Sequence, residues 1–574
     1  MNNRVYIIFG KSAAIFLMLF FIILPCGVLA AESSPSVPPD SPLYRDLDKL
    51  VAFGLVEPPI LGQRPYPRSE FARMTAEAMQ KLKEREDKDA DSFLQFAREQ
   101  KRRQQIEIVI KELSSEFKEE LVDMGALDGE RMRYRVHPFE ESIFYGKYLS
   151  SAPTTIPPDN GRGSINAQIN PLADYDLGRH PIFGTLNAVE AVARFKTGKY
   201  FSGYVRPRFE VDVPRDADMT GHVYVQNAYG TFSAGNFSLK FGRDSMLWGF
   251  GERGSLLFST NPRPLDGVWI TNPTPARLPW IFKYLGRWRY TLYGTNFGPE
   301  YEKKWAWLAG YKISLAPAKY VELGFGHAVQ IGGEGMPAPS FLDVLGEFSG
   351  FRPAGTDPNS PNLTNHTFEI DLLVRVPQLR GFQIYGNMAI EDYWKSIKKT
   401  LIQGCSYLGG IYLPALNSTG TMDLRAEYVH TNPLEFRHGL YTDGFTINRR
   451  LLGTDAGPDA DTLHFLFRQT LSSKIWYGIT LDWDYRRSNS YTELRNPDGT
   501  AGPIVKTADG PTEQRYRGLA DLDFKFHGNL GLHLTGGYER VKNLHFVQGS
   551  DCNNFIVAAA LSINFDRHFA FAAN

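Results

Sequence analysis

Residues 476–486 read Trp-Tyr-Gly-Ile-Thr-Leu-Asp-Trp-Asp-Tyr-Arg, and this stretch decides the fold class. Its odd-numbered positions, from Tyr477 to Tyr485, are large and apolar, whereas its even-numbered positions, from Gly478 to Arg486, are small or polar. Successive side chains of a β-strand point to opposite faces, so this alternation predicts a strand with one apolar and one polar face.

The same alternation recurs along most of the chain after about residue 145. It is found in Phe237–Arg243, Arg287–Phe297, Trp305–Leu315, Phe368–Val376, Met422–His430, Leu522–Phe526 and Phe555–Phe565. A body of about 430 residues, at roughly 24 residues for each strand and its loop, predicts about 16–18 antiparallel strands, an even number.

A soluble β-sandwich shows similar alternation with its charges facing water, but two features favour a transmembrane barrel. Trp and Tyr flank the apolar faces, as an interfacial girdle requires, and long polar stretches such as Gly332–Thr364 and Tyr491–Glu513 are typical of extracellular loops. The predicted girdle or lipid-facing residues are Trp305, Trp307, Trp476 and Trp483, and the predicted lumenal charges are Asp482, Asp484, Arg486, Asp521 and Asp523.

Composition agrees with a barrel. Aromatic residues make up 13% of the 574 residues, yet the mean hydropathy is only −0.30, as expected when alternate residues face lipid and a polar lumen. Basic and acidic residues are equal at 63 each, so the net charge does not indicate a nucleic-acid partner.

The N-terminus reads as a secretory signal peptide over residues 1–30. Arg4 and Lys11 precede an apolar run, and small residues lie at positions −3 and −1 of a cut after Ala30. Pro25 before Cys26 does not fit a lipidation site. Beyond residue 31 no apolar run reaches the length of about 20 residues that a membrane helix needs.

Residues 31–135 predict a small helical domain, followed by the barrel over 136–574. Helical spacing of apolar residues predicts helices over Leu43–Val56, from Ser69 onward, and over about 91–124. The first two helices and their Pro-rich link resemble one S-layer-homology unit, which implies peptidoglycan binding. The alternative is a helical hairpin that packs against the rest of the protein.

The sequence predicts neither an enzyme nor a cofactor or metal site. The 12 His residues are scattered, and the zinc-protease and serine-hydrolase motifs are absent. Cys405 and Cys552 are the two mature cysteines, and their spacing leaves a disulfide between them open.

Gly249, Gly251 and Gly254 form a G-x-G-x-x-G string, but no helix pattern follows, so dinucleotide binding is rejected. The glycines instead permit close backbone turns, and Arg243 and Asp244 are predicted to pair in a polar lumen. Trp248 is predicted to pack there or to stack on a sugar ring.

The stretch from Gly242 to Pro264 resembles the core motif of the capsule-assembly Wzi family, G-R-x-x-x-x-W-G-x-G followed by G-S-L-L-x-S-x-N and a proline. The motif residues are Gly242, Arg243, Asp244, Trp248, Gly249, Gly251, Gly254 and Ser255. The segment SPLYRDLDKLVAFGLV, beginning at Ser41, also resembles the start of many family members. The resemblance implies a barrel of about 18 strands, blocked at its periplasmic end by the helices, that retains capsular polysaccharide in a lectin-like way.

The expected function is therefore a non-enzymatic barrel for surface-polysaccharide attachment in the Gram-negative outer membrane, with outer-membrane lipid and capsule as partners and a monomeric state. The alternatives are a porin whose helical head is tethered to the cell wall, and a conduit barrel that sheathes a partner protein. The polysaccharide-binding residues cannot be chosen from the sequence, because Trp residues serve equally well as membrane anchors.

Overall fold

The computed structural model describes residues 32–571, except 87–92, 171, 173–174, 180–181, 253–254, 338–343, 345, 349–363, 392–403, 498–500, 527–528 and 566–568. The expected signal peptide, residues 1–30, lies outside the described residues. Within the described part, no helix is long and apolar enough to cross a membrane.

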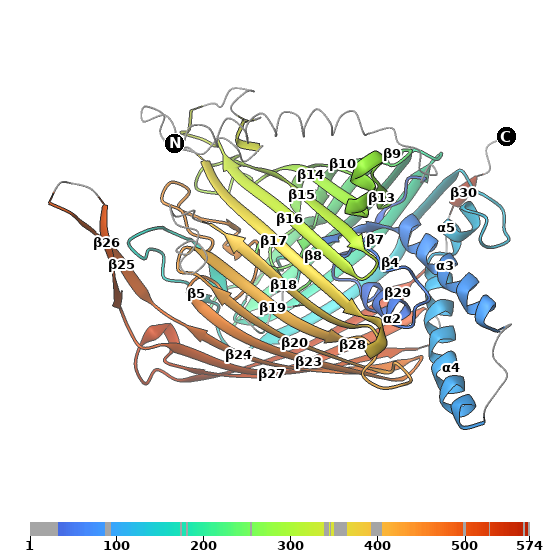
Figure 1. Ribbon diagram of the computed structural model, residues 1–574. Coiled ribbons are helices and arrows are strands. Elements are labelled where there is room, and N and C mark those ends of the chain that lie inside the picture. Colours follow the sequence, from blue (N-terminus) through green and yellow to red (C-terminus); the bar gives the residue numbers. More distant parts are fainter. Residues whose placement is uncertain are drawn as a thin grey trace.

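A closed antiparallel barrel forms most of the molecule (Figure 1). Among the described residues it has 18 long strands, with two short strands, β13 (Ala276–Arg277) and β30 (Phe569–Phe571), that continue β12 and β29. The long strands are β4 (Tyr134–Leu149), β7 (Gly184–Thr197), β8 (Phe201–Pro214), β9 (Thr220–Ala234), β10 (Phe237–Asp244), β12 (Leu265–Thr271), β14 (Arg287–Asn296), β15 (Trp307–Ala318), β16 (Val321–Ile331), β17 (Thr364–Val376), β18 (Phe382–Ile390), β19 (Cys405–Leu413), β20 (Met422–Thr431), β23 (Ala460–Ser472), β24 (Ile475–Arg486), β27 (Glu513–Lys525), β28 (Leu530–Lys542) and β29 (Cys552–Asn564). The predicted barrel and strand number are confirmed.

The barrel closes where β29 and β30 both pair with β4. Ile556 pairs with Leu149, and Phe571 pairs with Tyr134 at the other end of the same strand. Phe569 and Phe571 therefore extend the last strand beyond Phe565. The described strands at the seam therefore have no unpaired edge. A barrel in a membrane needs this closure, because lipid cannot satisfy free backbone N–H and C=O groups.

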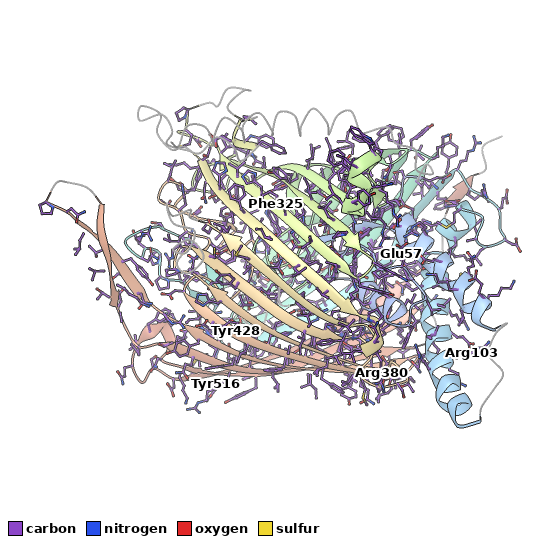
Figure 2. The ribbon with its side chains drawn as sticks, in the orientation of Figure 1. Glu57, Arg103, Phe325, Arg380, Tyr428 and Tyr516 are labelled. Carbon is purple, nitrogen blue, oxygen red and sulfur yellow. The ribbon has the colours of Figure 1, made fainter. Side chains whose placement is uncertain are left out.

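The period-two pattern separates the wall of the barrel from its lumen. In β24, Leu481 and Trp483 are exposed, whereas Asp482 and Asp484 are buried. Figure 2 labels Phe325, Tyr428 and Tyr516 on the strands, and their side chains are 38%, 46% and 41% exposed. This outward apolar surface is the one that faces lipid in a membrane barrel.

The alternation of faces along β24 shows that one of the four tryptophans predicted to face lipid does not. Trp305, Trp307 and Trp483 are exposed, as a girdle requires. Trp476 instead has the even parity of the lumenal positions in β24, and the guanidinium of Arg45 lies 5.0 Å from its ring centroid. A shift of one residue changes the face of a strand, so Trp476 faces the lumen rather than lipid.

The two ends of the barrel differ. At the short-turn end, strands are joined by brief connections such as residues 198–200, 235–236 and 319–320. The opposite loop end carries long connections, including residues 150–183 and 432–459. The predicted loop Tyr491–Glu513 is also at the loop end, but it contains an antiparallel ribbon, β25 (Asn489–Arg495) with β26 (Ala501–Ala508), that projects from the barrel (Figure 1).

In the described part of the chain, four helices precede the barrel: α2 (Leu43–Ala52), α3 (Arg68–Glu86), α4 (Phe93–Glu116) and α5 (Lys118–Asp123). The single helix predicted over about 91–124 is divided at Phe117, whose backbone is non-helical and whose ring stacks on Phe71 at 5.3 Å. We call α2–α5 the helical head. It lies at the end of the barrel opposite the β25–β26 ribbon (Figure 1).

The helical head is held to the rim of the short-turn end by apolar packing and ion pairs. Tyr44 and Leu47 belong to the same buried cluster as Tyr385 and Tyr412 of the lumen. At the rim, Asp123 of α5 pairs with Arg135 and with Lys196, both at 2.6 Å. The head is therefore one packed unit with the barrel and not a separate appendage.

We expect acid to loosen this attachment through Glu119. Burial alone would raise the pKa of the Glu119 carboxyl, but the hydrogen bond from His137 at 3.0 Å and the nearby Arg194 at 3.1 Å lower it below its usual range. A lowered folded-state pKa gives stability that is present above the unfolded pKa of about 4.3 and is lost as the pH falls through the folded value. The urea midpoint should fall between pH 6 and pH 3, and by less in Glu119→Gln.

The matched control is Glu130→Gln, which alters an exposed carboxyl in the linker after the head. It should keep the pH response of the unmodified protein. An equal response in Glu119→Gln and Glu130→Gln would contradict the assignment.

Candidate functional site

The glycine and tryptophan motif continues from β10 into the barrel, where two inward segments meet. After β10 the chain turns into the lumen and forms β11 (Leu247–Trp248), which pairs with β2 (Gln63–Arg64) from the link between α2 and α3. The Gly249 amide donates to the Gly62 carbonyl at 2.9 Å. We call residues 57–67 and 245–264 together the plug.

Two motif positions require glycine for geometric reasons. Gly249 has φ of 83°, and a Cβ atom there would lie 2.3 Å from Nδ2 of Asn387. Gly242 has φ of 125°, and its Cβ would lie 2.2 Å from the Ala228 carbonyl oxygen. Both backbones are in the region that side chains rarely adopt, which explains why the motif specifies glycine there.

Trp248 packs in the plug and does not present a face to a sugar. It is 1% exposed, and its ring meets those of Phe258 and Tyr293 edge-on, with centroids 4.8 and 5.4 Å away. Lys312 Nζ lies 5.5 Å from the same ring centroid. Of the two roles predicted for Trp248, packing is the one that this position supports.

The predicted Arg243–Asp244 pair does not form. Adjacent residues of β10 point to opposite faces, so the two side chains diverge. Arg243 binds Asp266 of β12 through two hydrogen bonds of 2.7 Å, whereas the buried Asp244 accepts from Asn227 at 3.1 Å. Lys240 also binds Asp244. The predicted pair is therefore replaced by two separate cross-strand pairs.

The remaining motif residues complete the inward turn. Gly251 is buried, and the Ser255 hydroxyl, which is 0% exposed, donates to the Phe258 carbonyl and accepts from the Phe258 amide at 3.1 Å. Gly254 lies outside the described residues. Trp248, Gly249, Gly251 and Ser255 of the motif thus lie in the plug, whereas Gly242, Arg243 and Asp244 belong to β10.

The plug is fixed to the barrel wall by buried charges. Glu322 of β16 accepts from the amides of Leu61 and Gly62 at 2.9 and 2.7 Å. Beside Trp248, Lys312 of β15 pairs with Glu369 at 3.1 Å and with Asp371, and all three side chains are 0% exposed. The Lys312 cluster pairs charges of β15 and β17 within the wall, and charges buried this deeply need their partners. Glu322 supplies the direct link between the wall and the plug.

Loop-end segments cover the plug from the other side. Ser259 donates to the carbonyl of Gly453 at 2.7 Å, and Asn261 donates to the carbonyl of Leu451 at 3.0 Å. These acceptors belong to the connection 432–459, which also pairs with the connection 150–183 through Ser164 and His438. Three layers therefore lie one over another in the described lumen: the helical head, the plug and the loop-end connections.

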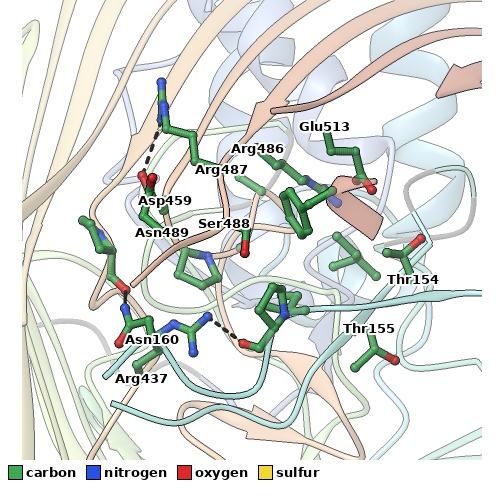
Figure 3. Close-up of a pocket in the computed structure, with 18 of the residues that line it drawn as sticks. Thr154, Thr155, Asn160, Arg437, Asp459, Arg486, Arg487, Ser488, Asn489 and Glu513 are labelled. Atoms are coloured by element: carbon green, nitrogen blue, oxygen red, sulfur yellow. Dashed lines mark hydrogen bonds and ion pairs between the residues drawn. The ribbon is translucent and has the colours of Figure 1, made fainter. Parts of the chain in front are cut away.

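A polar pocket opens among the loop-end connections (Figure 3). The cavity itself has a volume of about 30 Å³, and the total rises to about 520 Å³ when the adjoining space open to solvent is included. Its polar lining residues include Thr154, Asp159, Asn160, Arg437, Asp459, Arg486, Arg487, Asn489 and Glu513. We call it the loop-end pocket. Amide, carboxylate and guanidinium groups at one concave site are the donors and acceptors that bind polar ligands.

Two arginines of the loop-end pocket, Arg437 and Arg486, have N–H groups that make no hydrogen bond to the described residues. Among the described residues, Arg437 donates only to two backbone carbonyls, those of Pro157 at 2.7 Å and Gly163 at 3.3 Å. Burial lowers the pKa of Arg437 to about 10. Among the described residues, Nε of Arg437 and Nε and Nη1 of Arg486 have no acceptor. Buried N–H groups without acceptors are costly, and an anionic or hydroxyl-rich ligand would satisfy them.

The sequence profile described as "Capsule assembly protein Wzi" matches residues 176–555, which is more than half of the chain. The chain therefore belongs to the Wzi capsule-assembly family. The matched range contains all the motif residues and β7 to β28 of the barrel.

Two individual proteins are also similar to this chain, one in sequence and one in structure. An uncharacterized 55.8 kDa protein in the cps region of Klebsiella pneumoniae is 30% identical over 168 residues, which cover 29% of this chain. The match spans 32% of that relative's length. The solved Escherichia coli Wzi, described as a carbohydrate-binding β-barrel involved in group 1 capsule assembly, is similar at a TM-score of 0.61 and 16% identity, covering 93% of this chain and 100% of that one. At this identity the likeness shows a common fold, the outer-membrane barrel.

No Wzi motif marks the loop-end pocket, and reasoning from the sequence did not find it. Its lining comes from four connections at the loop end and from the ends of β24 and β27. Arg437, Asn160 and Asn489 are in polar stretches without periodicity. Cys405 and Cys552 are free thiols in the structure. Within the described residues, no group of three or more His, Cys, Asp or Glu side chains is arranged to hold a metal ion.

Proposed function

We propose that this protein binds surface polysaccharide at the loop end of a plugged outer-membrane barrel and attaches capsule without catalysis. Membership of the Wzi family is the observation that carries the proposal. The loop-end pocket supplies the chemistry, because its guanidinium and amide groups can bind the hydroxyl and carboxylate groups of an acidic sugar.

The proposal includes an orientation. Membrane barrels have short periplasmic turns and longer extracellular loops, so the short-turn end and the helical head would lie in the periplasm. The loop-end pocket would then face the cell exterior, where capsule is held. Protease added to intact cells should cleave the β25–β26 ribbon and leave the helical head intact. Cleavage of the head instead would contradict this orientation.

Replacing Arg437 by glutamine should weaken binding of an acidic capsular polysaccharide about tenfold or more, since a hydrogen bond from a charged donor contributes about 1.5–3 kcal/mol. Arg437 has no ion-pair partner among the described residues, so its loss leaves no buried carboxylate unpaired. Surface plasmon resonance with immobilised group 1 capsular polysaccharide, compared with neutral dextran, measures the change.

The matched control is Arg540→Gln. Arg540 is near the loop end, pairs with Asp551 at 3.3 Å, is half exposed and does not line the loop-end pocket. It should bind like the unmodified protein. Equal binding by both variants would place the polysaccharide elsewhere, and unaltered capsule retention in a deletion strain would reject the proposal itself.

Peptidoglycan binding by the helical head and a monomeric state remain predictions. The apolar residues Tyr44, Leu47 and Phe71 of α2 and α3 pack into the core shared with the lumen, so any peptidoglycan contact would use the other faces of these helices. Co-sedimentation of the intact protein with insoluble peptidoglycan tests the first prediction. Sedimentation equilibrium in detergent tests the second.

A further inference from the structure

The connection between β12 and β14 carries an apolar segment that no described residue covers. Its helical turn η1 (Trp280–Leu285) exposes Trp280 by 79%, Ile281 by 58% and Tyr284 by 76%. None of its six residues is buried. A contiguous patch of this kind on a water-soluble surface would be a liability, so it marks a contact surface.

The turn η1 lies beside the outward, lipid-facing surface of the barrel wall. It precedes β14 at the short-turn end and contacts β15. The outward residues next to it form a row across the strands, because Trp288 pairs with Leu315, and Leu315 pairs with Leu323. The exposed patch of η1 is therefore continuous with the apolar surface of the barrel, at its edge.

The residue types in η1 match the membrane interface better than the hydrocarbon core or water. Trp and Tyr concentrate at this depth, where an apolar ring and a polar edge are both accommodated. Lys283 lies over the Tyr284 ring at 5.2 Å and can extend its ammonium toward headgroups. The backbone φ of Trp280 is 60°, which is unfavourable for a bulky residue. The exposed position of the Trp280 side chain is therefore held at a cost in backbone strain.

We propose that η1 is an interfacial anchor that inserts Trp280, Ile281 and Tyr284 among the phospholipids of the leaflet on the short-turn side. It fixes the depth of the barrel in the membrane, and thereby holds the helical head clear of the bilayer. This proposal depends on the barrel spanning a membrane and not on polysaccharide binding, so its failure would leave the proposed function unaffected.

The test uses the full-length protein in vesicles of phosphatidylethanolamine and phosphatidylglycerol, with and without bromine on the acyl chains. The fluorescence of the unmodified protein minus that of Trp280→Phe reports Trp280 alone. We expect a blue-shifted difference spectrum that loses most of its intensity in brominated vesicles and resists aqueous iodide. A red-shifted difference spectrum, quenched by iodide and unaffected by bromine, would overturn the proposal and favour a soluble partner protein on η1.

A second measurement covers the case in which Trp280→Phe misfolds. In a Cys405→Ala, Cys552→Ser background, a spin label at Ile281→Cys should be more accessible to oxygen than to a water-soluble nickel complex. Met219→Cys, which is 69% exposed in a loop-end connection, is the matched control and should show the reverse preference. The same accessibility at both sites would reject lipid contact by η1.

Discussion

Replacing Lys312 by methionine is expected to lower the free energy of unfolding by about 3–5 kcal/mol. Lys312 is the buried cation between Glu369 and Asp371, and all three side chains are 0% exposed. Without it, two carboxylates lie beside each other under Trp248 with their charges uncompensated. Urea unfolding in vesicles, followed by tryptophan fluorescence, measures the loss.

The control variant removes the charges on both sides. Lys312→Met combined with Glu369→Gln and Asp371→Asn leaves no buried charge in this cluster, so most of the lost stability should return. This follows because removing one partner of a buried pair costs more than replacing the whole pair. If the triple variant were as unstable as Lys312→Met, lost packing rather than an unpaired charge would be the cause.

The second large effect is expected in conductance. An unplugged barrel of 16–18 strands leaves an aqueous channel, but here the head, the plug and the loop-end connections lie across the described lumen. The unmodified protein should therefore show no large, stable open-channel steps in planar bilayers. Deleting residues 250–260 of the plug should produce such steps, because that segment joins the wall to the loop-end connections.

Deletion of residues 492–505 provides the matched control. It removes most of the β25–β26 ribbon, which also lies at the loop end but projects away from the barrel (Figure 1). Its conductance should equal that of the unmodified protein. Large steps from the unmodified protein would favour the porin alternative, or a conduit for a partner, over a closed attachment protein.

Much of the architecture could be predicted from local sequence. In β24, the alternation from Tyr477 to Tyr485 assigns the outward face correctly, because parity along a strand is a local property. Of the motif glycines, Gly249 has positive φ where the chain enters the lumen, whereas Gly242 has positive φ within β10 and not in a turn. The outward face of β24 and the close backbone turn at Gly249 could both be predicted from neighbouring residues.

The errors arose where a local pattern was extended to contacts. Arg243 and Asp244 are adjacent in sequence, yet β10 directs them to opposite faces, and their partners come from β12 and β9. Trp476 was assigned to the girdle by residue type, although its parity places it in the lumen. In each case the prediction used the type of the residue and did not consider the face of the strand to which its side chain points.

The sequence alone therefore determined that this protein is a barrel with a helical head, because strand faces and helix faces repeat with short periods. Only the tertiary structure decided that the head, the plug and the loop-end connections lie in the described lumen and that a polar pocket lies at the loop end. The pairing of Gln63 with Trp248, and the meeting of Asn160 with Arg437 in one pocket, join segments far apart in the chain. Such contacts depend on barrel closure and loop packing, for which no periodic pattern in the sequence exists.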